Sequence, residues 1–262
     1  MTAASGYAIA AQDLGIKYDL RLKRRRTMRH TISQIVRGDA AASLGRDEFW
    51  ALQGVSFALG RKEVLAVVGG NGSGKSTLLL TIAKILRPDA GALTTYGHSA
   101  TLLTLGAGFQ QELTGRENIW LNAACLGFGP AKIEAALPGI IEFSELGEFI
   151  EAPVSTYSTG MRSRLGFSVA AHLEPEILLL DEVLGVGDPN FRQKSRDKMQ
   201  ELMGKAEAIV VVSHSVQFVQ EVATKVLWLD RGHLRAFGEP EAIMGEYAEA
   251  SKKARKPMRA VA

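Results

Sequence analysis

Apolar residues run along the chain in short stretches that differ in how regularly they alternate with polar residues. Residues 7–18, YAIAAQDLGIKY, alternate only in part, which favours a first, edge strand. ALQGVSFAL predicts a second strand, and VLWLDRGHLRAFG predicts a late hairpin. Three further stretches are almost wholly apolar, a pattern typical of parallel strands that are covered on both faces. They are EVLAVV, EILLL and AIVVV.

Helical patterns occupy the stretches between these strands. Thr77 to Leu86 predicts a helix that ends before Pro88, and another helix follows YSTGM. From about Glu112 to Phe149 the pattern is again helical. Strands that alternate with helices predict an α/β fold with a mainly parallel sheet, into which a helical subdomain at about 108–172 is inserted. Breaks in the helical stretch are expected at Gly127, Gly129, Pro130, Pro138 and Gly139.

Length and composition limit the class of protein. The 262 residues, 46% hydrophobic and 23% charged, suffice for one sizeable core. The net charge of +3 is too small to indicate a nucleic-acid-binding protein. The single cysteine, Cys125, excludes an intrachain disulfide and fits a reducing compartment. No apolar run approaches the roughly 20 residues that span a bilayer, and no signal peptide is evident, so we expect a soluble chain that a partner holds at any membrane.

Two basic segments stand apart from this pattern. Six arginines and lysines lie between Arg21 and Arg29, in a segment at about 21–48 that predicts an exposed excursion. The segment 249–262 is basic, contains a proline and predicts a flexible tail. Both are candidates for contact with anionic lipid headgroups or a pyrophosphate-linked lipid carrier, and the alternative is solvated surface charge.

The stretch VVGGNGSGKSTLLLTI contains the clearest chemical motif. Gly69 to Ser76 matches G-x-x-x-x-G-K-[ST], between an apolar strand and a helix. Glycines allow successive backbone N–H groups to face an anion, and Lys75 and Ser76 are expected to meet the β- and γ-phosphates and Mg²⁺. The motif therefore predicts a nucleoside triphosphate site. The binding residues we expect are Gly69, Asn71, Gly72, Ser73, Gly74, Lys75, Ser76 and Thr77.

Acidic residues and a histidine end two of the predicted parallel strands. Asp181 and Glu182 follow EILLL, at the strand end where ligands bind in such sheets. We expect Asp181 to hold Mg²⁺ and Glu182 to polarise an attacking water. His214 follows AIVVVS and is a candidate sensor of the γ-phosphate. The alternatives are a helix N-cap for the acidic pair and a structural role for the histidine.

The sequence YSTGMRSRL, with Ser158 and Gly160, resembles the signature of the ATP-binding cassette ATPases. The resemblance covers nearly all of residues 7 to 248. In that family this segment closes over the ATP held by the other subunit. The commonest version is L-S-G-G-Q, and Tyr157, Thr159 and Met161 depart from it. The form Y-S-x-G-M is typical of the branch that exports bacterial polysaccharides, and LGAGFQQELTGRENI and DEVLGVGDPNFRQKS resemble the same branch.

The resemblance implies further site residues and a fold. Gln110 corresponds to the family's glutamine, a candidate ligand of metal or water, and Asp188 to a subunit contact. Tyr18 corresponds to the aromatic that stacks on adenine, with Phe49 and Trp50 as alternatives. The implied fold is a P-loop NTPase core with a mainly parallel sheet, an N-terminal antiparallel β subdomain and an inserted α-helical subdomain, within a nucleotide-binding domain at 1–248.

The resemblance also implies an activity and partners. Two copies would pair head to tail and bury ATP and Mg²⁺, with Lys75, Glu182 and His214 as catalytic residues. They would drive two copies of a separately encoded transmembrane permease from the cytoplasmic face of the bacterial inner membrane. The expected substrate is a lipid-linked polysaccharide such as O-antigen, capsular or teichoic-acid-like polymer, and no nucleic acid is expected.

Several other functions fit the sequence less well. The sequence contains no N-K-x-D motif, which disfavours a GTPase. It shows no arginine-dense lid segment, which disfavours a small-molecule kinase. A soluble cassette ATPase acting on nucleic acid or ribosomes usually has two cassettes or coiled-coil arms. A scaffold that only holds ATP conflicts with the intact residues at Lys75, Asp181, Glu182 and His214. An exporter of a lipid or small molecule is the closest alternative, which the resemblance alone disfavours.

Overall fold

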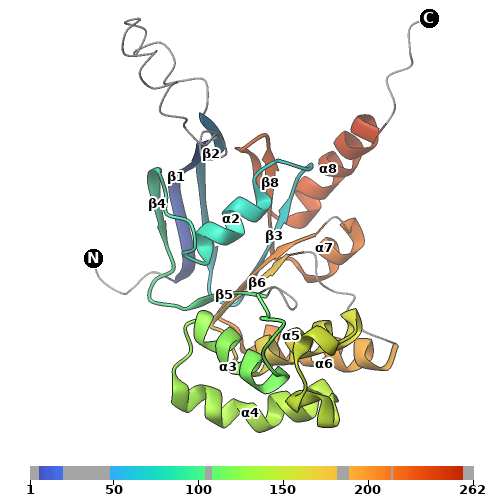
Figure 1. Cartoon of the computed structure of the whole chain (residues 1–262). Helices are drawn as coiled ribbons and strands as arrows, with labels where there is room; N and C mark the ends of the chain where they lie inside the picture. Colours follow the sequence, from blue (N-terminus) through green and yellow to red (C-terminus); the bar gives the residue numbers. More distant parts are fainter. Residues whose placement is uncertain (1–5, 20–47, 104–107, 182–188, 214, 256–262) are drawn as a thin grey trace, which may run out of the picture.

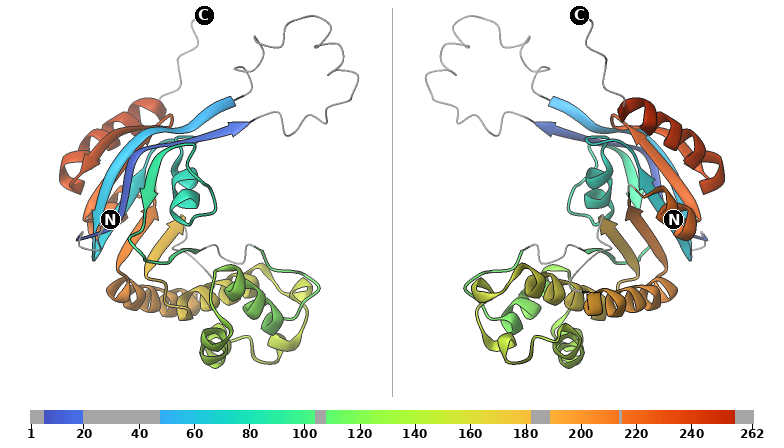
Figure 2. Two further views of the ribbon diagram at one scale, coloured as in Figure 1. Left: turned by 90° about the vertical axis from the view of Figure 1, so that its left-hand side faces the viewer. Right: turned by 90° about the vertical axis from the view of Figure 1, so that its right-hand side faces the viewer.

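The computed structural model describes residues 6–19, 48–103, 108–181, 189–213 and 215–255. Figure 1 shows the strands and several helices in the upper part of the molecule, with a separate group of helices below them. The side views in Figure 2 show the same helical group at one end. The chain therefore separates into a part built on sheets and a part built on helices.

A six-stranded sheet forms the centre of the molecule. Its strands are β3 (Glu63–Val68), β5 (Ala100–Leu103), β6 (Ile177–Asp181), β7 (Ala208–Val212), β8 (Lys225–Asp230) and β9 (His233–Gly238). The strand order is β5-β6-β7-β3-β8-β9, and every neighbouring pair is parallel except the hairpin β8–β9. The predicted mainly parallel sheet and the late hairpin are confirmed.

Strand β3 is buried on both faces, as its continuous apolar sequence predicts. Leu65 and Val67 pack in one core, which includes α2 (Lys75–Ile82). Ala66 and Val68 pack in a second core on the opposite face. Successive side chains of a strand point to opposite faces, so both sets must be apolar when helices or sheets cover both. The second core is covered by α6 (Pro189–Lys205), α7 (Val216–Val222) and α8 (Pro240–Arg255).

A three-stranded antiparallel sheet packs beside α2. It consists of β1 (Tyr7–Asp19), β2 (Glu48–Gly60) and β4 (Ala90–Thr94), in the order β2-β1-β4. The predicted antiparallel subdomain is confirmed. The prediction that β1 is an edge strand is wrong, because β4 pairs with its second edge. The pairing of β1 with both β2 and β4 shifts register around Asp13, whose φ is 49°. These shifts interrupt the alternation of buried and exposed side chains along β1.

The helical group has a core of its own. Its apolar side chains, from Ile119 to Leu173, form a buried cluster separate from the two cores of the large sheet. The group lies within the range 108–172 for which the sequence predicts a helical subdomain. Its elements are α3 (Gly115–Cys125), α4 (Pro130–Ser144), α5 (Thr159–His172) and the short 3₁₀ helices η2 (Gly147–Glu151) and η3 (Val154–Thr156).

Two of the expected breaks in the helical stretch are wrong. Helix α4 passes through Pro138 and Gly139 without interruption. A Cβ added at Gly139 would lie 3.2 Å from Cδ2 of His172, so this glycine allows α4 and α5 to approach closely. The other breaks are confirmed, since α3 ends at Cys125 and Pro130 is the first residue of α4.

Helix α2 starts earlier and ends earlier than its pattern predicts. It runs from Lys75 to Ile82, whereas the sequence predicts Thr77 to Leu86. Lys84 has a φ of 60°, so the backbone leaves the helical region well before Pro88. A left-handed residue just after the last helical turn is a common helix end.

Helix α8 extends beyond the boundary expected from the sequence. It continues to Arg255, so residues 249–255 are helical where a flexible tail is predicted, and residues 256–262 lie outside the described part. The basic cluster from Arg21 to Arg29 also lies outside it. None of the described helices combines the length and apolar character needed to cross a bilayer.

Asn118 connects α3 to the segment before it. The side chain is fully buried, and its Oδ1 accepts a hydrogen bond from the backbone N–H of Gln110 at 2.8 Å. Its Nδ2 lies within hydrogen-bond distance of the carbonyl oxygens of Gln110, Leu113 and Thr114, at 2.9 to 3.1 Å. A single buried amide thus gives the Gln110 N–H its acceptor and joins α3 to the segment before it.

Replacing Asn118 with Ala is expected to lower the free energy of unfolding by about 1–3 kcal/mol, because the Gln110 N–H loses its hydrogen-bond acceptor. The matched control is Asn122→Ala, one turn further along α3. Asn122 is half-buried, and its side chain makes no hydrogen bond within the described part of the chain. Its expected change is below about 1 kcal/mol. Denaturant unfolding measures both, and equal losses would contradict the role assigned to Asn118.

Candidate functional site

The loop from Gly69 to Gly74 joins β3 to α2, and its conformation requires glycine. Gly72 has a φ of 73°, and Gly74, the N-cap of α2, has a φ of 103°. A Cβ added at Gly74 would lie 2.6 Å from the carbonyl oxygen of Ala51 and 2.6 Å from Cδ2 of Leu52. The loop therefore lies against β2 and leads into the N-terminus of α2. The first N–H groups of a helix have no intrahelical acceptor and are suited to bind an anion.

Lys75 lies inside this loop. Its side chain is largely buried, with the residue 8% exposed, and its ammonium donates to the carbonyl oxygens of Gly69 and Gly70 at 2.9 Å each. Ser73 is 3% exposed, and its hydroxyl has no hydrogen-bond partner within the described part of the chain. A buried ammonium and a buried hydroxyl without a partner fit a loop that receives an anion.

Ser76 and Asp181 approach each other from two elements. The Ser76 hydroxyl donates to Oδ2 of Asp181 at 3.3 Å, and Asp181 is the last residue of β6. Among the described residues no group of three or more His, Cys, Asp or Glu side chains is suited to hold a metal ion. A hydroxyl and a carboxylate are the oxygen ligands that Mg²⁺ takes when phosphate and water complete its shell. The pair therefore fits a Mg²⁺ that arrives with a nucleotide.

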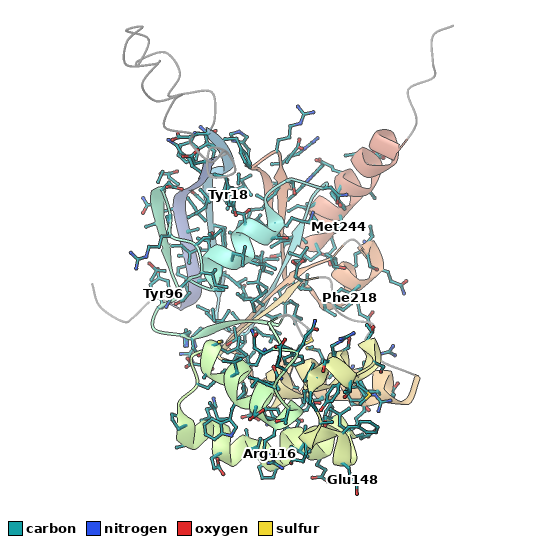
Figure 3. The ribbon with its side chains drawn as sticks, viewed as in Figure 1. Tyr18, Tyr96, Arg116, Glu148, Phe218 and Met244 are labelled. Atoms are coloured by element: carbon teal, nitrogen blue, oxygen red, sulfur yellow. The ribbon has the colours of Figure 1, made fainter. Side chains whose placement is uncertain are left out.

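A pocket of about 410 Å³ opens next to the loop. One wall is the loop and the start of α2, and the other is formed by aromatic residues of β1 and β2. Tyr18, labelled in Figure 3, lies in the same part of the molecule as α2. The lining residues are Tyr18, Phe49, Trp50, Ala51, Gly72, Ser73, Gly74, Lys75, Ser76, Thr77 and Arg231.

The three candidate aromatics are all at the pocket, but they are not equivalent. Tyr18 and Phe49 pair across β1 and β2, and their rings are stacked with centroids 5.6 Å apart. Phe49 is 48% exposed. Trp50 lies under the Lys17 ammonium, which is 4.6 Å from the ring centroid, and its ring also packs against Gly15. The Tyr18–Phe49 pair thus presents an aromatic surface, while the Trp50 ring already has neighbours of its own.

Arg231 also lines the pocket, although none of the sequence motifs includes it. It lies in the turn between β8 and β9, and β8 is the parallel neighbour of β3. The carboxyl end of β8 therefore reaches the same sheet edge as the Gly69–Gly74 loop. The one feature of the sequence that could have indicated Arg231 is the predicted hairpin, because its turn, Asp230–Arg231–Gly232, places a cation at that edge.

Other predicted site residues lie away from this pocket. Gln110 lines a separate pocket between α3 and the strand β5, together with Leu121 and Asn122. Ser158 and Gly160 line a third pocket, of about 330 Å³, with Phe149 and Arg164. Ser158 is the N-cap of α5, and its hydroxyl accepts from the N–H of Met161 at 3.2 Å. Asn71 is exposed at the tip of the loop and does not line the first pocket.

Tyr157 explains one departure from the common signature. Its ring is buried, and its hydroxyl donates to the carbonyl oxygen of Phe149 at 2.5 Å. Burial raises the pKa of this phenol above its ordinary value, so it stays a neutral donor at physiological pH. The residue that precedes Ser158 therefore fixes the segment leading into α5 through a buried hydrogen bond.

Glu182, Asp188 and His214 lie outside the described residues. The strands that lead to two of them are described. Strand β6 ends at Asp181 and pairs in parallel with β7, so that Asp181 lies opposite Val212. The roles predicted for Glu182 and His214 remain predictions.

Comparisons with known proteins identify relatives of this chain. Residues 52–185 match the ABC transporter family. The O-antigen export system ATP-binding protein of Klebsiella pneumoniae is 43% identical over 203 residues, which cover 78% of this chain and 82% of that protein. The teichoic acids export ATP-binding protein of Enterococcus faecalis is 46% identical over 199 residues, which cover 76% of this chain and 44% of that protein.

Two solved structures share the fold. One is an ATP binding subunit of an ABC transporter, with a TM-score of 0.67 and 21% identity, covering 92% of this chain and 93% of that chain. The other is a dimeric, post-hydrolysis state of an ATP-binding cassette bound to ADP and Pi. It has a TM-score of 0.64 and 17% identity, and the match covers 88% of this chain and 98% of that chain. The family match and the identity to its relatives establish more than the fold: the chain belongs to the ATPase subunits of the ABC transporter family.

Proposed function

We propose that this chain is the ATP-hydrolysing subunit of an exporter that moves a lipid-linked polysaccharide across the cytoplasmic membrane. The observation that carries the proposal is the pocket between the Gly69–Gly74 loop and the Tyr18–Phe49 pair, in a chain whose relatives are ATP-binding proteins of O-antigen and teichoic acid export. The polymer is of the O-antigen, capsular or teichoic-acid type.

The pocket residues take the following roles. The loop N–H groups and Lys75 bind the phosphates, and Thr77 supports them from the start of α2. The Tyr18–Phe49 pair stacks on the adenine, which favours Tyr18 as predicted and adds Phe49 as its partner. Ser76 and Asp181 hold Mg²⁺, which supplies positive charge to the phosphate oxygens when bound. Glu182 orients the attacking water and His214 senses the γ-phosphate. Gln110 remains a candidate ligand of metal or water.

A second copy of the chain completes the site. Ser158 and Gly160 line a pocket other than the one that holds Lys75 and Ser76. Figure 1 places α5 in the helical group and α2 with the sheets. A Cβ added at Gly160 would meet only the Ser158 hydroxyl oxygen, at 3.8 Å, so this chain's own packing does not require glycine there. A head-to-tail pair would bring this bare helix N-terminus to the phosphates held by the other copy.

The remaining partners follow from the same proposal. Two copies of a separately encoded transmembrane permease form the path for the glycan, and the chain binds them at the cytoplasmic face of the bacterial inner membrane. Closing of the pair around ATP and its reopening after hydrolysis drive the permease. The basic segments at 21–29 and 252–259 are candidates to bind anionic headgroups or the lipid carrier.

Replacing Lys75 with Ala is expected to raise the Kd for ATP by about tenfold to a hundredfold, because a buried ammonium no longer meets the phosphates. Isothermal titration of the purified chain measures this Kd. Lys132→Ala is the control, since the Lys132 ammonium lies over the Phe128 ring, 4.6 Å from its centroid, in the helical group. An unchanged Kd for the folded Lys75 variant would exclude this pocket as the ATP site.

Mixing two inactive variants tests whether the site is shared between copies. Lys75→Ala damages the loop and Gly160→Asp damages the signature, so neither variant alone is expected to hydrolyse ATP. Equal mixing places both in about half of the dimers, and each mixed dimer keeps one intact site of two, so about a quarter of wild-type ATPase activity returns. If each site lay within one chain, mixing would restore no activity.

Glu182→Gln in the native organism tests the cargo. Lipid-linked glycan is expected to accumulate on the cytoplasmic side of the membrane, while the cell surface loses it, because hydrolysis stops. Fractionation and glycan analysis measure both pools. Glu246→Gln, at an exposed position of α8, is the control and should leave export unchanged. A stable Glu182 variant without ATPase activity but with normal surface glycan would exclude polysaccharide as the cargo.

A further inference from the structure

We propose that Arg231 binds a phosphate group of the nucleotide from within the same chain, as a second cation beside Lys75. The inference rests on the proposed nucleotide pocket, which Arg231 lines together with the loop and the aromatic residues. The phosphate-binding motif, the strand-end acids and the signature do not include this residue. Arg231 would contact the nucleotide from the β8–β9 turn. Strand β8 and strand β6, which ends at Asp181, lie on opposite sides of β3 in the sheet.

The turn that carries Arg231 is fixed against both walls of the pocket. The N–H of Gly232 donates to the carbonyl oxygen of Ser73 at 3.1 Å, and the carbonyl oxygen of Gly232 accepts from the N–H of Gln53 at 2.8 Å. Gly232 has a φ of 83°, and a Cβ there would lie 2.9 Å from the carbonyl oxygen of Ala51. The backbone next to Arg231 is therefore bonded to the phosphate-binding loop and to the strand that carries Phe49.

The backbone of Arg231 itself is unusual. Its φ is 47°, a left-handed conformation that non-glycine residues adopt infrequently. Together with Gly232 it turns the chain sharply between Asp230 and His233, which pair across β8 and β9. The two hydrogen bonds of Gly232 hold this turn in place. The start of the Arg231 side chain is thus positioned before any ligand binds, which lowers the cost of ordering it on binding.

The charges around the turn leave the Arg231 guanidinium available to an anion. Lys75 is buried and donates to the carbonyl oxygens of Gly69 and Gly70, whereas Arg231 is exposed at the pocket surface. The neighbouring Asp230 carboxylate faces Arg235, at 3.9 Å. Within the described part of the chain, no carboxylate lies within 4.0 Å of the Arg231 guanidinium.

A phosphate is the ligand group that suits this position. The aromatic wall takes the base and the loop takes the phosphates, and the turn is bonded to Ser73 of the loop. A planar guanidinium donates two parallel hydrogen bonds to a phosphate, which an ammonium does not. Because the contact comes from the same chain and not from the second copy, it forms in the open state. It therefore strengthens the binding of ATP and ADP alike and raises affinity without raising kcat.

The test compares Arg231→Gln with Arg235→Gln. Arg235 lies four positions further along the same hairpin, and its guanidinium stacks on Trp228, 4.1 Å from the ring centroid, outside the pocket lining. Arg231→Gln is expected to raise the Kd for both ATP and ADP by about tenfold, because the charge-assisted contact with the phosphate is lost. Arg235→Gln is expected to leave both Kd values unchanged. Titration of each nucleotide into the purified chain measures them, and thermal unfolding checks that the variants fold.

Two further titrations separate the possible outcomes. Adenosine has no phosphate, so its Kd should be the same for wild type and Arg231→Gln. If the variant weakened the binding of adenosine as much as that of ATP, the assignment of Arg231 to a phosphate would be overturned. Arg231→Lys keeps the positive charge but loses the planar guanidinium. Its Kd for ATP and ADP should lie between those of wild type and Arg231→Gln. If Lys75→Ala weakens ATP binding while Arg231→Gln does not, this inference fails and the nucleotide pocket stands. If neither variant differs from wild type, the proposed pocket fails as well.

Discussion

The site depends on the burial of β3 on both faces. Leu65, Ala66, Val67 and Val68 are all fully buried, with alternate side chains in two different cores. Each large apolar side chain so placed contributes about 1.5–3 kcal/mol relative to exposure. Strand β3 also lies inside the sheet, between β7 and β8, both parallel to it. The carboxyl ends of these strands and of β6 therefore meet at one edge, where the phosphate-binding loop, Asp181 and the Arg231 turn are found.

The pocket at that edge joins elements that are distant in sequence. Its aromatic wall comes from two antiparallel strands, its phosphate wall from the loop after β3, and its second cation from the last hairpin. The Ser73–Gly232 and Gln53–Gly232 hydrogen bonds connect the three. The loop is bonded to the β8–β9 turn through Ser73, and the turn is bonded to β2 through Gln53, so the loop is connected to both elements before a nucleotide binds.

The helical group is held together by buried hydrogen bonds as well as by its apolar core. Its position depends on a few buried polar contacts as well as on its core: Asn118 holds the segment around Gln110, and Tyr157 holds Phe149. Both contacts act on the segments that enter α3 and α5. The signature residues Ser158 and Gly160 thus lie at a helix start that lines a different pocket from this chain's own loop, as the proposed two-chain site requires.

The sequence alone determined the parts of the protein whose physics is local or repeats along a strand. The strands β3, β6 and β7 were predictable because burial on both faces leaves continuous apolar runs, and the loop was predictable because its glycines, Lys75 and Ser76 are adjacent. Only the tertiary structure decided that β1 is central, that Pro138 and Gly139 lie within a helix, and that Arg231 joins Tyr18 and Phe49 at the pocket. Each of these depends on a partner far along the chain: β4 for β1, His172 for Gly139, and Ser73 for the Arg231 turn. A sequence pattern reports the burial of a residue, whereas the identity of its neighbour follows from how the sheets and helices pack.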